Sequence, residues 1–198
     1  DWNNTIGRAR LDRDNSGIPT PVATTGSAVI AFPDDYENAV TPGEYVQFVA
    51  INSDTGNGDV YRIDSAGAPA ESAATDLNAG SACGLNNIDI SSIAVAGSAG
   101  TGHLLAGAAS SAQVYFSPDG GRSWQQSTKE PTGGSSTRVV ISPDFSTSGR
   151  AYAVTCGSES AFSYTTDSGT TWNQLSLIDT RISDIVDLAP SPNYAEDN

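Results

Sequence analysis

Two nine-residue stretches decide the fold: FSPDGGRSW at 116–124 and YTTDSGTTW at 164–172. Both read aromatic, Ser/Thr, any residue, Asp, small, Gly, any residue, Ser/Thr, Trp. A fixed period of about 20–50 residues is typical of solenoids, propellers and other repeat arrays. The matching positions are 48 residues apart, and they pair Ser117 with Thr165, Asp119 with Asp167, Gly121 with Gly169, and Trp124 with Trp172.

Composition limits the classes of function. A chain of 198 residues can bury one sizeable core, so we expect one domain or one segment of a larger domain. The net charge of −14 argues against nucleic acid as a partner, because phosphate binding needs a basic surface. No apolar run approaches the ~20 residues of a membrane span. No signal peptide is present and Asp1 is not a native start, so we expect a processed chain or a piece of a longer one.

The repeat extends beyond the two stretches. A shift of 47 residues places 136–144 against 89–97, and a shift of 48 places 160–167 against 112–119. Each unit then contains four short β-type runs that are separated by Gly, Ser, Asp or Pro turns. A weaker copy lies upstream, with its four runs at 28–36, 45–52, 59–64 and 71–77.

A second marker fixes the register of the units. PDDY at 33–36, PDF at 143–145 and PNY at 192–194 each follow an apolar run that would be the first strand of a unit. No sustained 3.6-residue apolar period competes with this β pattern. A four-stranded antiparallel sheet cannot bury its faces alone, so such units must stack.

The predicted fold is therefore all-β: a β-propeller of four-stranded antiparallel blades, about three blades plus part of a fourth, in a segment of a larger propeller. The predicted parts are an N-terminal segment at 1–26 that ends a preceding blade, a degenerate blade at 27–80, blades bearing the nine-residue turn at 81–130 and 131–178, and the first strand of a further blade at 179–198.

The segments SPDGGRSW and TTDSGTTW resemble the Asp-box, or BNR repeat, of sialidase-like and sortilin-type β-propellers. SPDF and SPNY resemble the markers of bacterial surface proteins that carry the same repeats. The resemblance covers roughly residues 27–198 and implies the propeller architecture. It implies no activity, because enzymes and non-enzymes share the box, and it implies that the boxes lie on the face opposite an active or binding site.

The box residues have simple physical roles. The two Asp side chains can accept hydrogen bonds from N–H groups of their own turn, while Ser117 and Thr165 close its other side. Gly121 and Gly169 supply a backbone position where positive φ costs little. Each Trp can bury a large ring between adjacent sheets. We therefore expect a structural rather than a catalytic role.

Candidates for catalysis are few. A sialidase-like enzyme needs an arginine cluster, but Arg62 lies in YRID, with Asp64 where that family has Pro, and is predicted at the surface or a sheet edge. A pair of glycosidase carboxylates about 5–10 Å apart remains open among 23 acidic residues. The densest acidic group is Asp34, Asp35 and Glu37, which we interpret as solvated loop residues.

Calcium is a possible ligand, because two polar loops carry oxygen donors. The first resembles half of an EF-type loop, but its closing position is Ala23; ordinary Asp/Asn/Gly turns are the alternative for both loops. The first loop comprises Asp12, Asp14 and Ser16, and the second comprises Asp54, Asn57 and Asp59.

Three further residues carry expectations. His103 is the only histidine and is predicted to start a strand at the surface. Cys83 connects two units, and Cys156 lies in a loop between the second and third strands of the following unit. Those loops emerge on one face of a propeller, so a disulfide is possible and would suit a secreted protein, with two separate thiols as the alternative.

Two functions of different class follow. The first is a non-enzymatic extracellular or cell-surface propeller segment with a structural, envelope or partner- or glycan-binding role. The second is a fragment of a sialidase-like or other glycoside hydrolase. The expected partners are the remaining blades of the parent protein or other protein chains, with a glycan as a possible ligand.

Overall fold

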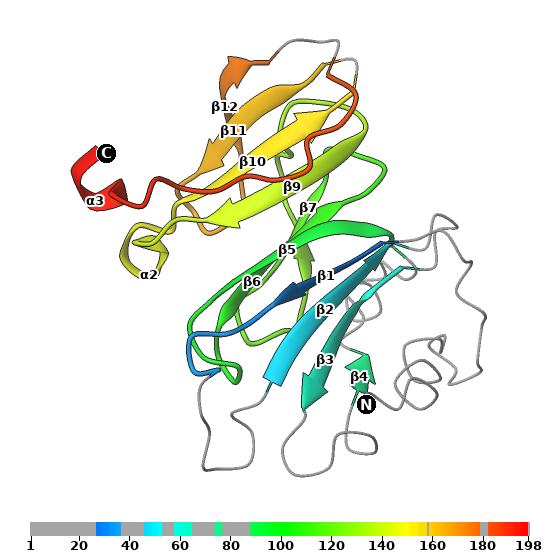
Figure 1. Ribbon diagram of the computed structural model, residues 1–198, viewed down its shortest axis with the longest axis vertical. Coiled ribbons are helices and arrows are strands. Elements are labelled where there is room, and N and C mark those ends of the chain that lie inside the picture. Colours follow the sequence, from blue (N-terminus) through cyan, green and yellow to red (C-terminus); the bar gives the residue numbers. More distant parts are fainter. Residues whose placement is uncertain are drawn as a thin grey trace.

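The computed structural model describes residues 27–36, 46–52, 58–64, 74–76, 88–157, 159–178 and 182–197. These residues form three four-stranded antiparallel sheets, in which the strand order follows the chain (Figure 1). The first sheet contains β1 (Ser27–Ala31), β2 (Val46–Asn52), β3 (Val60–Asp64) and β4 (Ala74–Asp76). The second contains β5 (Ile90–Ala96), β6 (His103–Ala108), β7 (Val114–Ser117) and β8 (Gln125–Gln126). The third contains β9 (Ser136–Ile141), β10 (Ala151–Cys156), β11 (Ala161–Thr165) and β12 (Asn173–Leu177). The expectation of an all-β chain is confirmed.

Successive side chains along a strand point to opposite faces of the sheet, so a sheet can pack against a neighbour on each face. In β10, Ala151 and Ala153 are fully buried toward the second sheet, whereas Tyr152 between them is half-buried. In the second sheet, Leu104 and Leu105 are adjacent in β6 and enter different cores. A strand that is apolar at every position can therefore pack on both sides.

The faces meet in two cores. The first core joins the first and second sheets, and its largest buried side chains include Phe48, Leu104 and Trp124. The second core joins the second and third sheets and includes Leu105, Phe116 and Trp172. Each sheet thus contacts its neighbour in the chain, as expected of units that cannot bury their faces alone.

One glycine shows how closely the second and third sheets approach. A Cβ atom added at Gly107 would lie 2.1 Å from the carbonyl oxygen of Thr137. Ser91 Oγ donates to this same carbonyl at 2.6 Å, and Thr137 Oγ1 donates to the carbonyl of Ser111 at 2.9 Å. Hydroxyl groups therefore satisfy buried backbone groups where the two sheets meet.

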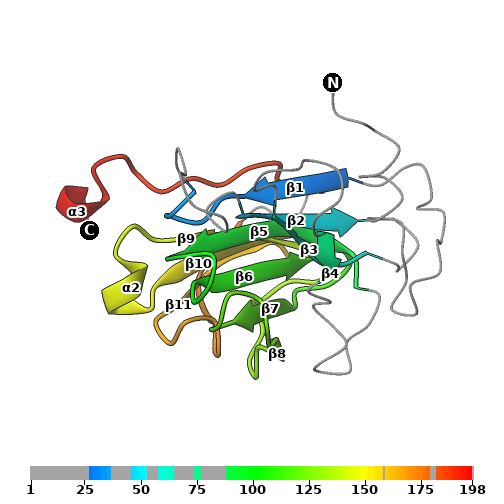
Figure 2. The same cartoon turned by 90° about the horizontal axis from the view of Figure 1, so that it is seen from below.

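Two short helices occur among the described residues: α2 (Phe145–Ser148) and α3 (Tyr194–Asp197). With four residues each, they fall far short of the ~20 that a helix needs to cross a bilayer. Both begin at the aromatic residue of an SPDF or SPNY marker, and both lie at the same end of the molecule (Figure 2). The sequence analysis did not predict them, since one turn is too short to show a helical period.

The strand expected within 179–198 is not formed in the part that the structure describes. Residues 182–193 carry no strand and run past β9 before α3 begins (Figure 1). Arg138 Nε in β9 donates to the carbonyl of Ile185 at 3.1 Å. A strand is defined by pairing with a neighbour, and no described strand pairs with this segment. It is positioned beside the third sheet without forming the ladder that was expected.

Candidate functional site

The stretch 164–172, here the second turn, is organised around the carboxylate of Asp167. Thr165 Oγ1 donates to Oδ1 at 2.7 Å, and Thr171 donates its backbone N–H to the same oxygen at 2.8 Å. Thr171 Oγ1 donates to Oδ2 at 2.5 Å. Three donors from one loop therefore converge on one carboxylate, in the local side-chain-to-backbone pattern typical of Asp in turns.

The stretch 116–124, here the first turn, repeats this arrangement around Asp119. Ser117 Oγ donates to Oδ1 at 2.9 Å, and the backbone N–H of Ser123 donates to it at 2.8 Å. Ser123 Oγ donates to Oδ2 at 2.7 Å. The same atoms at positions 48 apart make the same bonds, so the two turns share a structure as well as a pattern.

The first hydroxyl of each turn also accepts a hydrogen bond. Gly121 N–H donates to Ser117 Oγ at 2.8 Å, and Gly169 N–H donates to Thr165 Oγ1 at 3.2 Å. Because each hydroxyl donates to its Asp and accepts from its Gly, it links the two halves of the loop. Both hydroxyl residues are fully buried.

Two consecutive residues in each turn have positive φ. The values are 70° and 86° at Gly120 and Gly121, and 59° and 95° at Ser168 and Gly169. The sequence analysis assigned this conformation to Gly121 and Gly169 alone. Ser168 is the one described residue other than glycine with positive φ, a conformation that costs L-residues about 1–2 kcal/mol.

The two tryptophans connect the turns to the preceding sheets. Trp124 and Trp172 are each 1% exposed and belong to the first and second cores, respectively. Trp172 Nε1 donates to the carbonyl of Gly169 at 3.2 Å. Among the described residues nothing accepts a hydrogen bond from Trp124 Nε1. The two indole rings are equally buried, but only the Nε1 of Trp172 has a hydrogen-bond acceptor among the described residues.

Two residues of the turns were missing from the candidate site. Ser123 and Thr171 each provide two of the three donors to the Asp carboxylate. The signal was present in the sequence, because the eighth position is Ser or Thr in both stretches. A hydroxyl there can reach the second carboxylate oxygen while its own backbone N–H reaches the first.

The hydrogen bonds decide the charge state of the two Asp residues. Partial burial by itself raises the pKa of Asp119, but the bonds from Ser123, Ser117 and the Arg122 N–H outweigh it, so the pKa lies below its usual value. The pKa of Asp167 is lowered in the same way, with burial opposing the bonds from Thr171 and its neighbours. Both carboxylates are ionised near neutral pH and fully engaged, so neither suits general acid or base chemistry.

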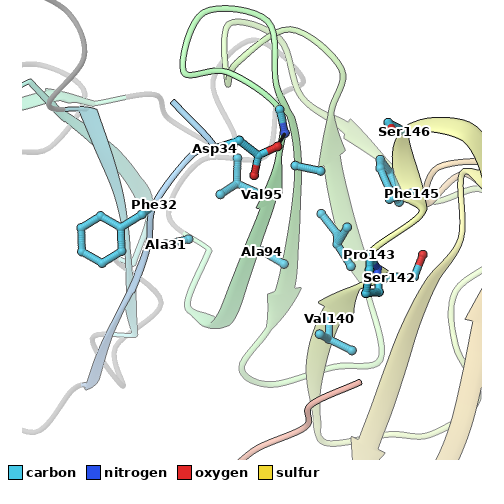
Figure 3. Close-up of a pocket in the computed structure, with 13 residues that line it drawn as sticks. Ala31, Phe32, Asp34, Ala94, Val95, Val140, Ser142, Pro143, Phe145 and Ser146 are labelled. Carbon is cyan, nitrogen blue, oxygen red and sulfur yellow. Dashed lines mark hydrogen bonds between the residues drawn. The ribbon is translucent and has the colours of Figure 1, made fainter. Parts of the chain in front are cut away.

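A cleft of about 430 Å³ lies where β1, β5 and β9 end (Figure 3). Its lining is mainly apolar and includes Phe32, Val95 and Phe145, and Asp34 is its one ionisable residue. Asp34 Oδ2 accepts the N–H of Gly97 at 2.8 Å. A cleft with a few polar groups can admit a small ligand, but its single carboxylate already has a backbone partner.

The acidic loop is bound to the protein more firmly than expected. Asp34 N–H also donates to the carbonyl of Gly97 at 2.9 Å, and Asp35 Oδ1 accepts the N–H of Ala99 at 2.8 Å. These bonds join the loop after β1 to the loop between β5 and β6. Asp34 and Asp35 are exposed loop residues, as interpreted from the sequence, and their carboxylates also accept backbone N–H groups of a neighbouring loop. Glu37 lies outside the described residues.

Arginines reach the same loop. Arg62 in β3 is half-buried and donates to the carbonyl of Ala99 at 2.7 Å, and Arg122 donates to the carbonyl of Gly100. Asp64, at the end of β3, pairs with Val46 in the ladder. Each guanidinium thus has an N–H bonded to a backbone carbonyl of this loop, which holds both side chains beside it.

His103 starts β6, as predicted, but it lies at a junction between sheets. It is half-buried, and its Nε2 lies 2.9 Å from the carbonyl oxygen of Ser168 in the second turn. Its ring packs against Phe116 and Phe145, at centroid distances of 6.2 and 5.0 Å. This side chain therefore connects β6 to two elements of the third unit.

The cysteine and calcium predictions fall largely outside the described residues. Cys156 is buried, and its Sγ accepts the N–H of Ile185 at 3.1 Å. Cys83 is not described, so the disulfide stays a prediction. Asp59 is buried and accepts the N–H of Val60 at 2.7 Å. The other calcium candidates, which lie outside the described ranges, are Asp12, Asp14, Ser16, Asp54 and Asn57. Within the described part of the chain, no three His, Cys, Asp or Glu side chains gather as a metal site.

Compared with models of known protein families and with curated proteins, the chain matches none.

Proposed function

We propose that the chain is a segment of an Asp-box β-propeller with a non-enzymatic role, in the architecture of an extracellular or cell-surface assembly or in binding a protein partner or glycan. One observation carries the proposal. Arg138 donates to the carbonyl of Ser91 on one side and to that of Ile185 on the other. These three residues are spaced by 47 positions, so corresponding points of consecutive units lie side by side. Inner strands of neighbouring propeller blades are related in this way.

The turns support a structural role for the box. Their hydroxyl, carboxylate and glycine groups bond to one another, and their indole rings are buried between sheets. Nothing in this arrangement requires a nucleophile, a raised carboxyl pKa or a metal. The chemistry of the box is used to hold the outer strand of each unit.

The contacts of the segment after the third sheet favour further four-stranded units as the partners of this chain. Tyr194 of α3 shares a 2.9 Å hydrogen bond with Tyr152 on the third sheet, and its place in its unit matches that of Phe145 of α2, which enters the second core. The beginning of one unit thus packs against the sheet of the unit before it, twice in succession. The proposed partners are further four-stranded units, supplied by the parent protein or by another chain.

A hydrolysis assay tests the non-enzymatic role. The purified chain is incubated with fluorogenic sialosides and other glycosides, and its glycan binding is measured in parallel on an array. We expect no turnover above buffer, with or without glycan binding.

Asp34→Asn is the informative variant, because it alters the ionisable group of the cleft, and Asp187→Asn changes an exposed acid as the matched control. Turnover that Asp34→Asn abolishes and Asp187→Asn preserves would replace the proposal with the glycoside hydrolase alternative.

A further inference from the structure

His103 joins the second and third sheets through three contacts. Its ring is parallel to that of Phe116 in β7, with an interplanar angle of 2°, and tilted by 57° against Phe145 of α2. Its Nε2 faces the carbonyl oxygen of Ser168 at 2.9 Å. Because a carbonyl oxygen only accepts, Nε2 carries the proton. One titratable ring therefore links a strand pair, a helix and a strained turn.

Protonation would place a second N–H and a positive charge in this junction. The Ser168 carbonyl already engages Nε2, and the described residues offer no acceptor to Nδ1. Burial lowers the pKa of His103, and the hydrogen bond to Ser168 offsets this in part. The neutral ring is thus the form that fits the closed junction.

The charged groups on the surrounding elements do not compensate. The Asp119 carboxylate is bonded to Ser123, that of Asp144 to Ser142, and that of Asp167 to Thr171. Asp119 and Arg122 follow β7, Asp144 and Arg150 flank α2, and Asp167 lies in the second turn. At the end of β5, which pairs with β6, the Asp34 carboxylate accepts the N–H of Gly97. Arg122 reaches the carbonyl of Gly100, and Arg150 reaches Tyr194.

The next unit shows a different solution at the same position. Arg150 lies 47 residues after His103, and its guanidinium donates to the phenol oxygen of Tyr194 at 3.3 Å. There, a permanent cation meets an oxygen acceptor on the aromatic residue of α3. Beside His103, the residue that corresponds to Tyr194 is Phe145, whose side chain has no oxygen. Of these two positions, pH can change the charge only at His103.

We propose that His103 makes the contact between the second and third sheets a pH-sensitive joint, closed at neutral pH and loosened by acidification. Loosening exposes the faces that form the second core, including Leu105 and Trp172. The inference concerns the stacking of the sheets and does not depend on the function proposed above.

The direction of the pH dependence follows from the linkage between proton binding and stability. The folded pKa lies below the unfolded value of about 6.5, so the neutral imidazole contributes stability fully above that value. This contribution is lost as pH falls toward and through the folded pKa. Each pKa unit of difference corresponds to a tenfold change in the opening equilibrium.

The test uses the full chain and its single histidine. NMR gives the imidazole titration without overlap, and hydrogen–deuterium exchange, corrected for the intrinsic pH effect, reports protection at residues 103–108 and 164–172. We expect a pKa below 6.5 and a loss of protection that begins near pH 6.5 and amounts to about tenfold for each pKa unit by which the measured value lies below 6.5. A His103 pKa at or above 6.5, or protection that does not change between pH 7 and pH 5, overturns the proposal.

His103→Gln is the matched variant, because its side-chain amide keeps an N–H donor for Ser168 and does not titrate. Its protection is expected to be independent of pH between 5 and 7. If this variant fails to fold, the titration and exchange of the natural chain still decide the question. A pH dependence that persists in folded His103→Gln also contradicts the proposal.

Discussion

Replacing Gly169 with alanine tests the turn and the packing between sheets together. Gly169 has φ of 95°, where an L-residue costs about 1–2 kcal/mol. A Cβ atom added there would lie 2.7 Å from Leu105 Cδ2 in the second sheet. Leu105 is fully buried, so it cannot yield freely, and such overpacking costs about 1–3 kcal/mol. The expected loss in the free energy of unfolding is therefore about 2–5 kcal/mol.

Two other glycines make a graded series with Gly169. Gly134 has an open surrounding and no positive φ, so Gly134→Ala should change stability by less than about 1 kcal/mol in either direction. Gly97 has φ of 87° but only a mild contact, 3.3 Å from Gly102 Cα. Gly97→Ala should therefore lower the free energy of unfolding only by the cost of placing an L-residue at positive φ, about 1–2 kcal/mol.

Urea unfolding followed by tryptophan fluorescence measures the series, with m-values compared to establish that the transition is the same. Combining Gly169→Ala with Leu105→Val should recover part of the loss, because the shorter side chain relieves the clash. A Gly169→Ala loss within about 0.5 kcal/mol of that of Gly134→Ala would refute the reasoning.

Four further predictions concern hydrogen bonds. Asp119→Ala and Asp167→Ala should each lower the free energy of unfolding by about 1–3 kcal/mol, because several charge-assisted bonds are lost from a partly exposed site; equal stability to the natural chain in urea would contradict this. Because both pKa values are lowered, these carboxylates contribute stability above about pH 4 that is lost as pH falls through their folded pKa values, and changing both to Asn should flatten the urea midpoint between pH 4 and pH 2. Trp172→Phe should cost about 1 kcal/mol more than Trp124→Phe, since only Trp172 Nε1 has a described acceptor; the reverse order in thermal unfolding would count against it. Arg138→Ala should destabilise by about 2–3 kcal/mol and raise hydrogen exchange in β5 and 182–190 together, whereas a change confined to one side would show that the two contacts are independent.

The strands of the repeated units could be predicted from the sequence. Aligning the chain with itself at the repeat spacing located the strands, because every unit repeats the same alternation of apolar runs and turns. The donors to Asp119 and Asp167 could be anticipated as well, since Asx turns depend on residues that are local in the chain.

Contacts between units were harder to predict, because they depend on how the sheets meet. The pattern gives no sign that Asp34 would bond to Gly97 or that His103 would reach Ser168. The segment at 182–193 shows a second limit. Its residue pattern is that of a strand, but a strand also needs a pairing partner, and sequence periodicity does not supply one.

The burial of the two tryptophans has a consequence for the order in which the protein is made. Trp124 completes a core with the first sheet, and Trp172 completes one with the second, so each ring docks on residues that precede it in the chain. A ribosome delivers those preceding residues first. As each turn emerges, the surface that receives its indole ring has already been synthesised. The repeat is therefore suited to growth in one direction during translation, with every new unit closing against the last.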